Sequence, residues 1–298
     1  MRLNTPRAWD RAITRIVTAT IMRPRRSLSI QRKALNAIGG YWPLPKGIQQ
    51  TQLILAARPA VQWAAKHNKA KKVILYLHGG VYCIGSPKSH RDLCSHLATY
   101  ADRPVIALDY RLAPDHVFPA AIDDVIAAYL ELLAQGYAAK DIIIAGDSAG
   151  GGLSLTCLQQ LRDQAIELPA AAYLISPWVD LRNTAPSHPA MAALDPVLST
   201  AYLSALRDHY LQGTPNTDAR VSPLLGDVSG LCPVFIQVGS DEVLLDDSLS
   251  LARSLKAAGG EVNLEESDGL WHVFQITPSL FKDARIALEK AGEFIKQY

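Results

Sequence analysis

Short, continuous apolar runs alternate with amphipathic helical patterns along most of this sequence. Runs such as 72–77 and 104–109 lack polar alternation, which is typical of strands buried on both faces. The segment 122–133 places its apolar residues on one helical stripe. Because strands that alternate with crossover helices form a parallel sheet covered on both sides, we predict an α/β fold. The predicted strands are 51–57, 61–65, 72–77, 104–109, 141–145, 170–176, 233–239 and 261–266, and the other predicted helices are 148–163, 245–255 and 280–295.

Composition excludes several classes of protein. The 298 residues contain 30 basic and 28 acidic side chains, so there is no overall field to attract nucleic acid. We find no apolar run long enough for an integral membrane span. The four cysteines lack the spacing of a disulfide framework or a zinc site, and the N-terminus lacks a secretory apolar core. We therefore expect a cytoplasmic protein with reduced cysteines and no metal.

The first 33 residues form a basic segment with nine Lys or Arg side chains and a single acid, Asp10. Apolar side chains recur there at helical spacing, which predicts an amphipathic helix. Such a helix can lie on a membrane, act as a transit peptide or pack its apolar stripe on the protein's own body. Since packed amphipathic helices are the ordinary case, we favour the third interpretation.

Residues 183–222 interrupt the alternation between two predicted strands. This stretch is rich in Pro, Ser and Thr and contains one helical pattern, 197–211. An excursion of this length is usually a lid or binding element. We therefore predict a catalytic domain made of 46–182 and 223–298, with residues 1–45 and the inserted segment 183–222 forming a cap.

The sequence Gly-Asp-Ser-Ala-Gly at 146–150 lies directly between a predicted strand and a predicted helix. A nucleophile elbow requires this context, because the tight turn exposes a serine hydroxyl above the sheet. The helix N-terminus beneath favours developing negative charge. We predict that Ser148 is a catalytic nucleophile.

A serine nucleophile needs a base and an acid that orients the base. In this topology the chain order is serine, acid, histidine, each at the end of a strand. Asp241 follows the strand 233–239 and His272 follows the last strand, so we predict these two residues for the acid and the base. Three acids compete with Asp241. We expect Glu242 to point away if the chain is extended, and Asp246 and Asp247 are more plausible as charges at a helix start.

The segment His-Gly-Gly-Val-Tyr at 78–82 follows the strand 72–77. Acyl transfer needs N–H groups aimed at the oxyanion of the tetrahedral intermediate. We predict these donors to be the backbone amides of Gly79, Gly80 and Ala149, and we interpret His78 as a scaffold for the loop.

Five motifs in this order resemble those of the hormone-sensitive-lipase-like (family IV) carboxylesterases, α/β-hydrolases with a helical cap. The resemblance covers about residue 45 to the end, and it departs at Val81, where many members have a third glycine. The motifs are 78–82, Tyr-Arg-Leu-Ala-Pro-Asp-His-Val-Phe-Pro-Ala at 110–120, Gly-Asp-Ser-Ala-Gly-Gly at 146–151, Ser-Asp-Glu-Val-Leu-Leu-Asp-Asp-Ser at 240–248 and Trp-His-Val-Phe at 271–274.

The resemblance implies an α/β-hydrolase fold with a mostly parallel eight-stranded sheet. It implies a serine carboxylesterase without cofactor or metal, which acts on small-molecule acyl esters of short to medium chain length through an acyl-enzyme. Ser148, Asp241 and His272 would form its triad. A homodimer is compatible with such a family.

Five further residues are expected to support the loop 110–120 or the substrate pocket. We assign Asp109 and Arg111 a structural role in the loop 110–120. Tyr82, Trp178 and Trp271 are candidates for lining the substrate pocket, with packing between cap and sheet as an equal alternative.

Three other functions have to be distinguished from ester hydrolysis. An amidase or aryl-formamidase shares the oxyanion motif, and ratios of formamide to ester turnover would distinguish it. A non-catalytic ligand-binding receptor is disfavoured because His272 is present together with the serine and acids. A true lipase would need activation by emulsified substrate.

Overall fold

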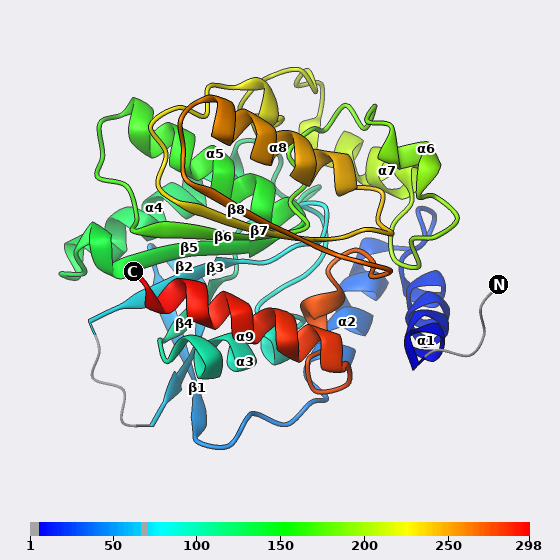
Figure 1. Cartoon of the computed structure of the whole chain (residues 1–298), viewed down its shortest axis with the longest axis horizontal. Coiled ribbons are helices and arrows are strands. Elements are labelled where there is room, and N and C mark those ends of the chain that lie inside the picture. Colours follow the sequence, from blue (N-terminus) through cyan, green and yellow to red (C-terminus); the bar gives the residue numbers. More distant parts are fainter. Residues whose placement is uncertain (1–5, 67–70) are drawn as a thin grey trace.

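The computed structural model describes residues 6–66 and 71–298, and within them one eight-stranded sheet forms the centre of the molecule (Figure 1). The strand order is β1-β2-β4-β3-β5-β6-β7-β8. This arrangement confirms the predicted α/β-hydrolase sheet. The strands are β1 (Ile48–Leu55), β2 (Arg58–Ala65), β3 (Val73–Leu77), β4 (Val105–Leu108), β5 (Ile142–Asp147), β6 (Ala171–Ile175), β7 (Val234–Gly239) and β8 (Val262–Ser267).

Strand pairing is parallel from β4 through β8, whereas β2 runs antiparallel to both β1 and β4. Strand β5 lies between β3 and β6 in the middle of the sheet, and all of its residues are buried. The carboxyl ends of parallel strands meet at one edge, where α/β proteins place their functional groups. The turns after β3, β5, β7 and β8 therefore share this edge.

Helices cover both faces of the sheet (Figure 1). The helices α3 (Arg91–Ala101) and α9 (Lys282–Lys296) lie on one face. The helices α4 (Ala120–Ala134), α5 (Ala149–Asp163) and α8 (Leu245–Ala257) lie on the other. The strand side chains fill a separate hydrophobic cluster on each side, which explains why the strand sequences are apolar throughout.

Four further helices gather at one end of the sheet (Figure 1). These are α1 (Pro6–Ile21), α2 (Leu28–Gly39), α6 (Ser187–Ala190) and α7 (Thr200–Leu211), and α6 and α7 belong to the segment predicted as an insertion. Single turns of 3₁₀ helix at Ala139–Asp141, Pro223–Leu225 and Phe274–Ile276 complete the structure. Among the described residues we find neither a helix suited to crossing a bilayer nor a side-chain group suited to holding a metal ion.

The first hairpin turns earlier than predicted. We expected Arg58 and Pro59 to form the turn, but both belong to β2, where they pair with Leu55 and Ile54. The turn is made by Ala56 and Ala57, which have φ values of 48° and 61°. Two consecutive residues with positive φ match the twist of a two-residue hairpin, although neither is the usual glycine or asparagine.

Helix α3 was not predicted. Its buried side contains Asp92 and Ser95 beside Leu93 and Leu97, so the apolar spacing is broken by polar residues. The Asp92 carboxylate accepts hydrogen bonds from the backbone and the hydroxyl of Ser279, at 3.0 and 2.7 Å. A buried polar group with such partners costs little, and a pattern of hydrophobicity alone does not reveal it.

The prediction that the N-terminal helix packs its apolar stripe on the body is wrong. Trp9 and Ile16 of α1 are 72% and 68% exposed, and Ile13 is 44% exposed. Among the side chains of α1 whose burial the structure describes, from Trp9 onward, Ile21 at the end of the helix is the buried one. Helix α1 instead contacts the body through polar side chains on its opposite face, which form hydrogen bonds to backbone carbonyls.

Candidate active site

Ser148 lies at the tight turn between β5 and α5, with φ 53° and ψ −121°. This strained conformation for a non-glycine residue is held by backbone hydrogen bonds from Ser148 N to Ile175 O and from Trp178 N to Ser148 O. A Cβ on Gly150 would overlap the carbonyl oxygen of Leu77, so the turn requires a glycine there. The sequence prediction of a strand–turn–helix around this serine is confirmed.

His272 contacts a carboxylate at the same edge of the sheet. Its Nδ1 lies 2.7 Å from Oε2 of Glu242, and the two side chains are 4% and 0% exposed. Oε1 of Glu242 accepts hydrogen bonds from the Ser176 hydroxyl at 2.8 Å and from the Gly239 amide at 2.7 Å. Glu242 is therefore a fully bonded carboxylate that fixes the orientation of the imidazole.

This geometry corrects the prediction that Asp241 orients His272. The Asp241 carboxylate points the other way, to Nη2 of Arg11 on α1 at 2.5 Å. The two acids do point in opposite directions, as expected for neighbours, but the chain turns after β7. The amide of Asp241 bonds to Leu270 O, and this turn brings Glu242 back to the end of its own strand.

One short segment connects the serine turn to the histidine loop. Residues 175–178 bond to the backbone of Ser148 on one side, and the Ser176 hydroxyl accepts a hydrogen bond from Val273 N at 3.2 Å on the other. Ser176 thus contacts both Glu242 and the residue after His272. Sequence reasoning missed Ser176, and its position at the end of β6 is the signal that would have found it.

The environment of His272 favours a proton on its ring. Burial alone would lower the pKa of His272, but the hydrogen bond and charge of Glu242, together with the charges of Asp195 and Asp147, raise it above the ordinary value. The Asp195 carboxylate accepts hydrogen bonds from the amides of Val197, Leu198 and Val243, and burial raises its pKa to about 6. Asp195 thus fixes the inserted segment to the turn that carries Glu242.

The loop 78–82 lies beside the serine turn but does not present the amides we predicted. Gly79 N donates to Oδ1 of Asp147 at 2.9 Å and is therefore engaged, which corrects its assignment as an oxyanion donor. Among the hydrogen bonds of the described residues, none uses the amides of Gly80, Val81 or Ala149. Gly80 has a φ of 121°, and a Cβ there would overlap Ile84 O. Sequence reasoning missed Val81, whose φ of 54° is also uncommon for a branched residue.

Asp147 anchors this loop from beneath. Its Oδ1 also accepts from the Tyr76 hydroxyl at 2.8 Å, and it lies 3.2 Å from Nε2 of His90. Burial would raise the pKa of Asp147, but the charge and hydrogen bonds of His90, with those of Tyr76 and Gly79, lower it. The pair His90–Asp147 therefore resembles the acid–base pair of a catalytic triad. Asp147, however, also accepts hydrogen bonds from Tyr76 and Gly79, so the pair holds the loop 78–82 in place.

His78 packs within the same scaffold. Its ring stacks on Tyr110 with centroids 4.3 Å apart, and burial, followed by the charge of His90, lowers the pKa of His78 to about 3. His78 is therefore a neutral buried side chain in the loop, in agreement with its interpretation as a scaffold.

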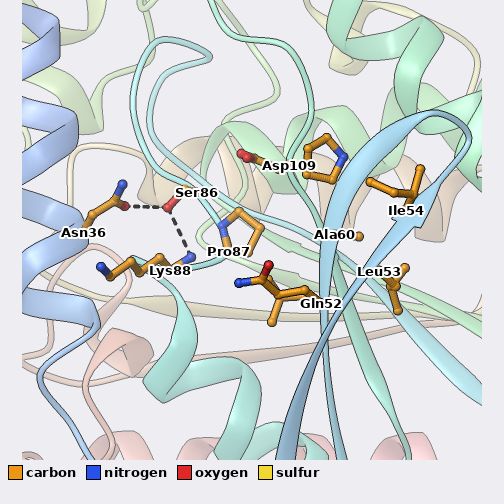
Figure 2. A pocket seen from close by; sticks show the side chains of 11 residues that line it. Asn36, Gln52, Leu53, Ile54, Ala60, Ser86, Pro87, Lys88 and Asp109 are labelled. Carbon is orange, nitrogen blue, oxygen red and sulfur yellow. Dashed lines mark hydrogen bonds between the residues drawn. The ribbon is translucent and has the colours of Figure 1, made fainter.

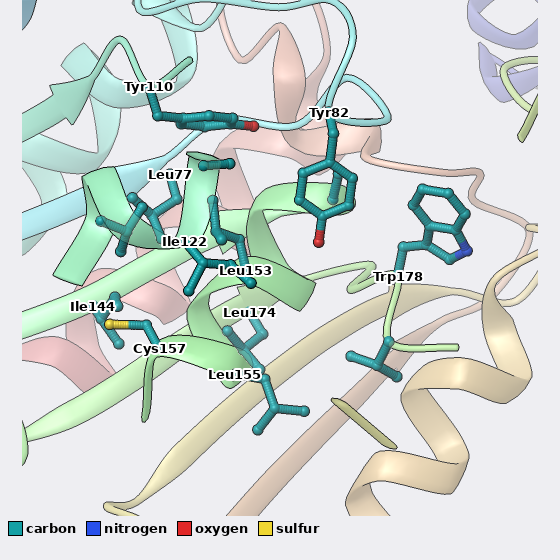
Figure 3. Close-up of a cluster of buried hydrophobic side chains, with 14 of the residues drawn as sticks. Leu77, Tyr82, Tyr110, Ile122, Ile144, Leu153, Leu155, Cys157, Leu174 and Trp178 are labelled. Atoms are coloured by element: carbon teal, nitrogen blue, oxygen red, sulfur yellow. The ribbon is translucent and has the colours of Figure 1, made fainter. Parts of the chain in front are cut away.

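The three candidate pocket aromatics are buried in packed contacts. Tyr82 stacks on Tyr210 of α7 with centroids 4.0 Å apart, and its ring lies beside the indole of Trp178 (Figure 3). The Trp178 indole donates to Asn183 Oδ1 at 2.9 Å, whereas Trp271 packs edge-on against Phe281. The structure thus brings Tyr82 and Trp178 together next to the serine turn.

A separate depression lies beyond this site, between α2, the β1–β2 hairpin and the loop 86–88 (Figure 2). It has a volume of about 380 Å³, and none of the predicted catalytic residues lines it. Asp109 faces this depression, whereas Arg111 binds the Asp124 carboxylate of α4 at 2.8 Å. The structural role expected for Arg111 is thus visible as a link between the loop 110–120 and α4.

Known proteins resemble this chain in sequence and in fold. Residues 74–276 match a family described by the alpha/beta hydrolase fold. The chain is 41% identical over 250 residues to an acetyl-hydrolase of Streptomyces hygroscopicus, covering 84% of each protein. It is 40% identical to an esterase of Acinetobacter venetianus, over 76% of this chain and 75% of that one. A crystal structure of an esterase from the bacterial hormone-sensitive lipase family superposes with a TM-score of 0.94 at 37% identity, covering 99% of this chain and 98% of that chain.

Proposed function

The chain belongs to the α/β-hydrolase family, among the hormone-sensitive-lipase-like carboxylesterases, and from this premise we propose that it cleaves short- to medium-chain acyl esters with Ser148, His272 and Glu242. It is a carboxylic ester hydrolase. One observation carries the assignment of residues: a buried imidazole bonded to the Glu242 carboxylate follows β8, while Ser148 leaves the central strand at the same edge.

In the proposed first half-reaction, Ser148 Oγ attacks the ester carbonyl carbon and transfers its proton to Nε2 of His272. The carbonyl oxygen becomes an oxyanion, which the amides of Gly80, Val81 and Ala149 receive. The intermediate then expels the alcohol, which takes the proton from His272. A Ser148 acyl ester remains on the protein.

In the second half-reaction, water loses a proton to His272 as it attacks the acyl carbon, and the carboxylic acid leaves as Ser148 recovers its proton. Glu242 accepts the Nδ1–H of His272 throughout, which fixes the tautomer and stabilises the imidazolium. Because the Glu242 carboxylate also has Ser176 and Gly239 as donors, it stays in place as the charge on the ring changes.

Two contacts support the proposal that the helices at the end of the sheet form a cap over this site. Helix α7 contributes Tyr210 to the stack on Tyr82, and Asp195 joins the segment before α7 to the Glu242 turn. We therefore propose that residues 1–45 and 183–222 bound the acyl and alcohol pockets, with Tyr82, Trp178 and Trp271 near their walls. The similarity to an acetyl-hydrolase supports short acyl groups.

The experiment compares turnover of p-nitrophenyl butyrate by the wild type and by Ser148→Ala. We expect kcat to fall by roughly five to six orders of magnitude, as loss of a nucleophile does in serine hydrolases. The control is Ser154→Ala on the same helix, where the hydroxyl only donates to Gly150 O. A fluorophosphonate should add its phosphonyl group to the Ser148 peptide alone. Turnover near normal in Ser148→Ala, or labelling elsewhere, would refute the proposal.

A further inference from the structure

Charge is distributed unevenly between the N-terminal segment and the rest of the chain. Residues 1–33 contain nine basic side chains and one acid, whereas the remainder contains 21 basic and 27 acidic side chains. The first segment thus has a net charge of +8 and the remainder −6. A difference of this size between parts of one chain indicates a local attraction for a negatively charged surface.

Helix α1 presents an apolar stripe away from the body. Trp9, Ile13 and Ile16 follow one another at intervals of one helical turn, and they are 72%, 44% and 68% exposed. Val17, beside them, is 37% exposed. In Figure 1, α1 lies at the outer edge of the molecule. Its large apolar side chains are therefore available to a surface outside the protein.

Polar groups on the other face hold this helix in place. Arg11 donates to Leu194 O at 2.6 Å and to Gly269 O at 2.7 Å, in addition to its pair with Asp241. The Thr18 hydroxyl donates to Pro196 O at 2.5 Å. Because these bonds use the face opposite to the stripe, the apolar side chains are outward while the helix is fully docked.

We propose that this stripe, Trp9, Ile13, Ile16 and Val17, docks on a membrane surface that contains anionic phospholipid. A helix with a Trp- and Ile-bearing face and a basic flank binds the headgroup region, where its apolar side enters the acyl boundary. The exposed Arg23, Arg25 and Lys33 after the stripe supply the electrostatic part. A second copy bound through the same face would bring two segments of charge +8 together, which disfavours a dimer there.

The first test is flotation of the full chain with unilamellar vesicles of phosphatidylcholine, either alone or mixed with phosphatidylglycerol. We expect the wild type to float with the mixed vesicles, to float less with phosphatidylcholine alone and to be released by salt. Ile16→Glu should lower the bound fraction at least about tenfold, because it loses the burial of one apolar side chain and adds a negative charge.

The matched control is Ile286→Glu, which changes an isoleucine of α9 that is 39% exposed. We expect it to bind vesicles like the wild type, and the thermal midpoint of each variant shows whether it is folded. Equal binding by Ile16→Glu and Ile286→Glu, or no binding of the wild type to anionic vesicles, would overturn the proposal.

Tryptophan fluorescence gives a second readout of membrane binding that needs no added charge. Trp9 is far more exposed than Trp63, Trp178 and Trp271, which are 1%, 0% and 3% exposed. Brominated acyl chains should therefore quench the wild type on mixed vesicles, and Trp9→Phe should lose most of this quenching. If light scattering instead shows a dimer that Ile16→Glu dissociates, the stripe binds a second copy and the lipid proposal is wrong.

Discussion

Two adjacent acids serve two different regions of the molecule. Glu242 lies at the buried edge of the sheet, whereas Asp241 lies at the contact between α1 and the body. Glu242 is 0% exposed and has three hydrogen-bond partners, Ser176, Gly239 and His272, which follow or end three neighbouring strands. Asp241 and its partner Arg11 are each 22% exposed. Position in a motif therefore does not assign a carboxylate to catalysis, whereas burial and the groups that the carboxylate contacts do.

The two regions also differ in what a lost contact costs. A buried carboxylate that binds three donors leaves all of them unsatisfied when it is removed. An ion pair in partial contact with water contributes little, because solvent and salt screen it. We therefore expect large effects at the buried edge and small effects at the α1 contact.

The largest effect in this comparison should come from Glu242→Gln. The amide keeps the size of the side chain but no longer stabilises the imidazolium or holds the tautomer, and the equivalent change in serine proteases lowers kcat roughly 10⁴-fold. The measurement is kcat and KM for p-nitrophenyl butyrate. Asp241→Asn is the matched control and should stay within about threefold of the wild type. The reverse order of the two variants would contradict the assignment.

A smaller loss should follow Asp147→Ala, because Gly79 and Tyr76 lose the acceptor that positions the loop 78–82. We expect kcat to fall roughly 10²-fold with a lesser change in KM, as when an oxyanion donor is displaced. Asp147→Asn retains an acceptor oxygen and should recover most of the activity. An unchanged kcat in the folded alanine variant would show that the loop keeps its position without the carboxylate.

The pH dependence of kcat/KM should report the raised pKa of His272. The base must be neutral, so a pKa above the ordinary value moves the acidic limb of the profile to higher pH. In Glu242→Gln the hydrogen bond to a charged partner is lost, and the limb should move to lower pH. Profiles from about pH 5 to about pH 9 test this. An acidic limb at the same pH in the variant would show that Glu242 does not raise the pKa of His272.

The smallest effect should come from Arg11→Gln at the α1 contact. This change removes the ion pair with Asp241, in which both side chains are 22% exposed, and the two hydrogen bonds from Arg11 to carbonyl oxygens of Leu194 and Gly269. Because water replaces the lost partners at this partly exposed contact, we expect a total cost of about 1 kcal/mol. We expect a loss of about 2 °C in Tm and a change of less than about threefold in kcat. A loss comparable to that of Glu242→Gln would show that the contact of α1 controls the catalytic edge.

Much of the fold could be predicted because its signals are local. Strands buried on both faces have uninterrupted apolar sequences, and the glycines around Ser148 are required by the close approach of the Leu77 backbone. The predicted strand ends differ from the observed ones by a few residues. At the first hairpin, the turn formed by Ala56 and Ala57 lacks the residues that usually mark it.

The errors arose where the answer depends on contacts between distant segments. The choice between Asp241 and Glu242 depends on a turn that is fixed by Leu270, about 30 residues later in the chain. The engagement of Gly79 depends on Asp147, and the direction of the stripe on α1 depends on carbonyl groups near residue 194. No periodicity within one segment carries this information.

A crystal structure of the protein after reaction with a fluorophosphonate would test the proposed site most directly. We expect phosphorus bonded to Ser148 Oγ, a phosphonyl oxygen within hydrogen-bond distance of the amides of Gly80, Val81 and Ala149, and His272 bonded to Glu242. An imidazole bonded to Asp241, or an oxygen held by the Gly79 amide, would contradict it.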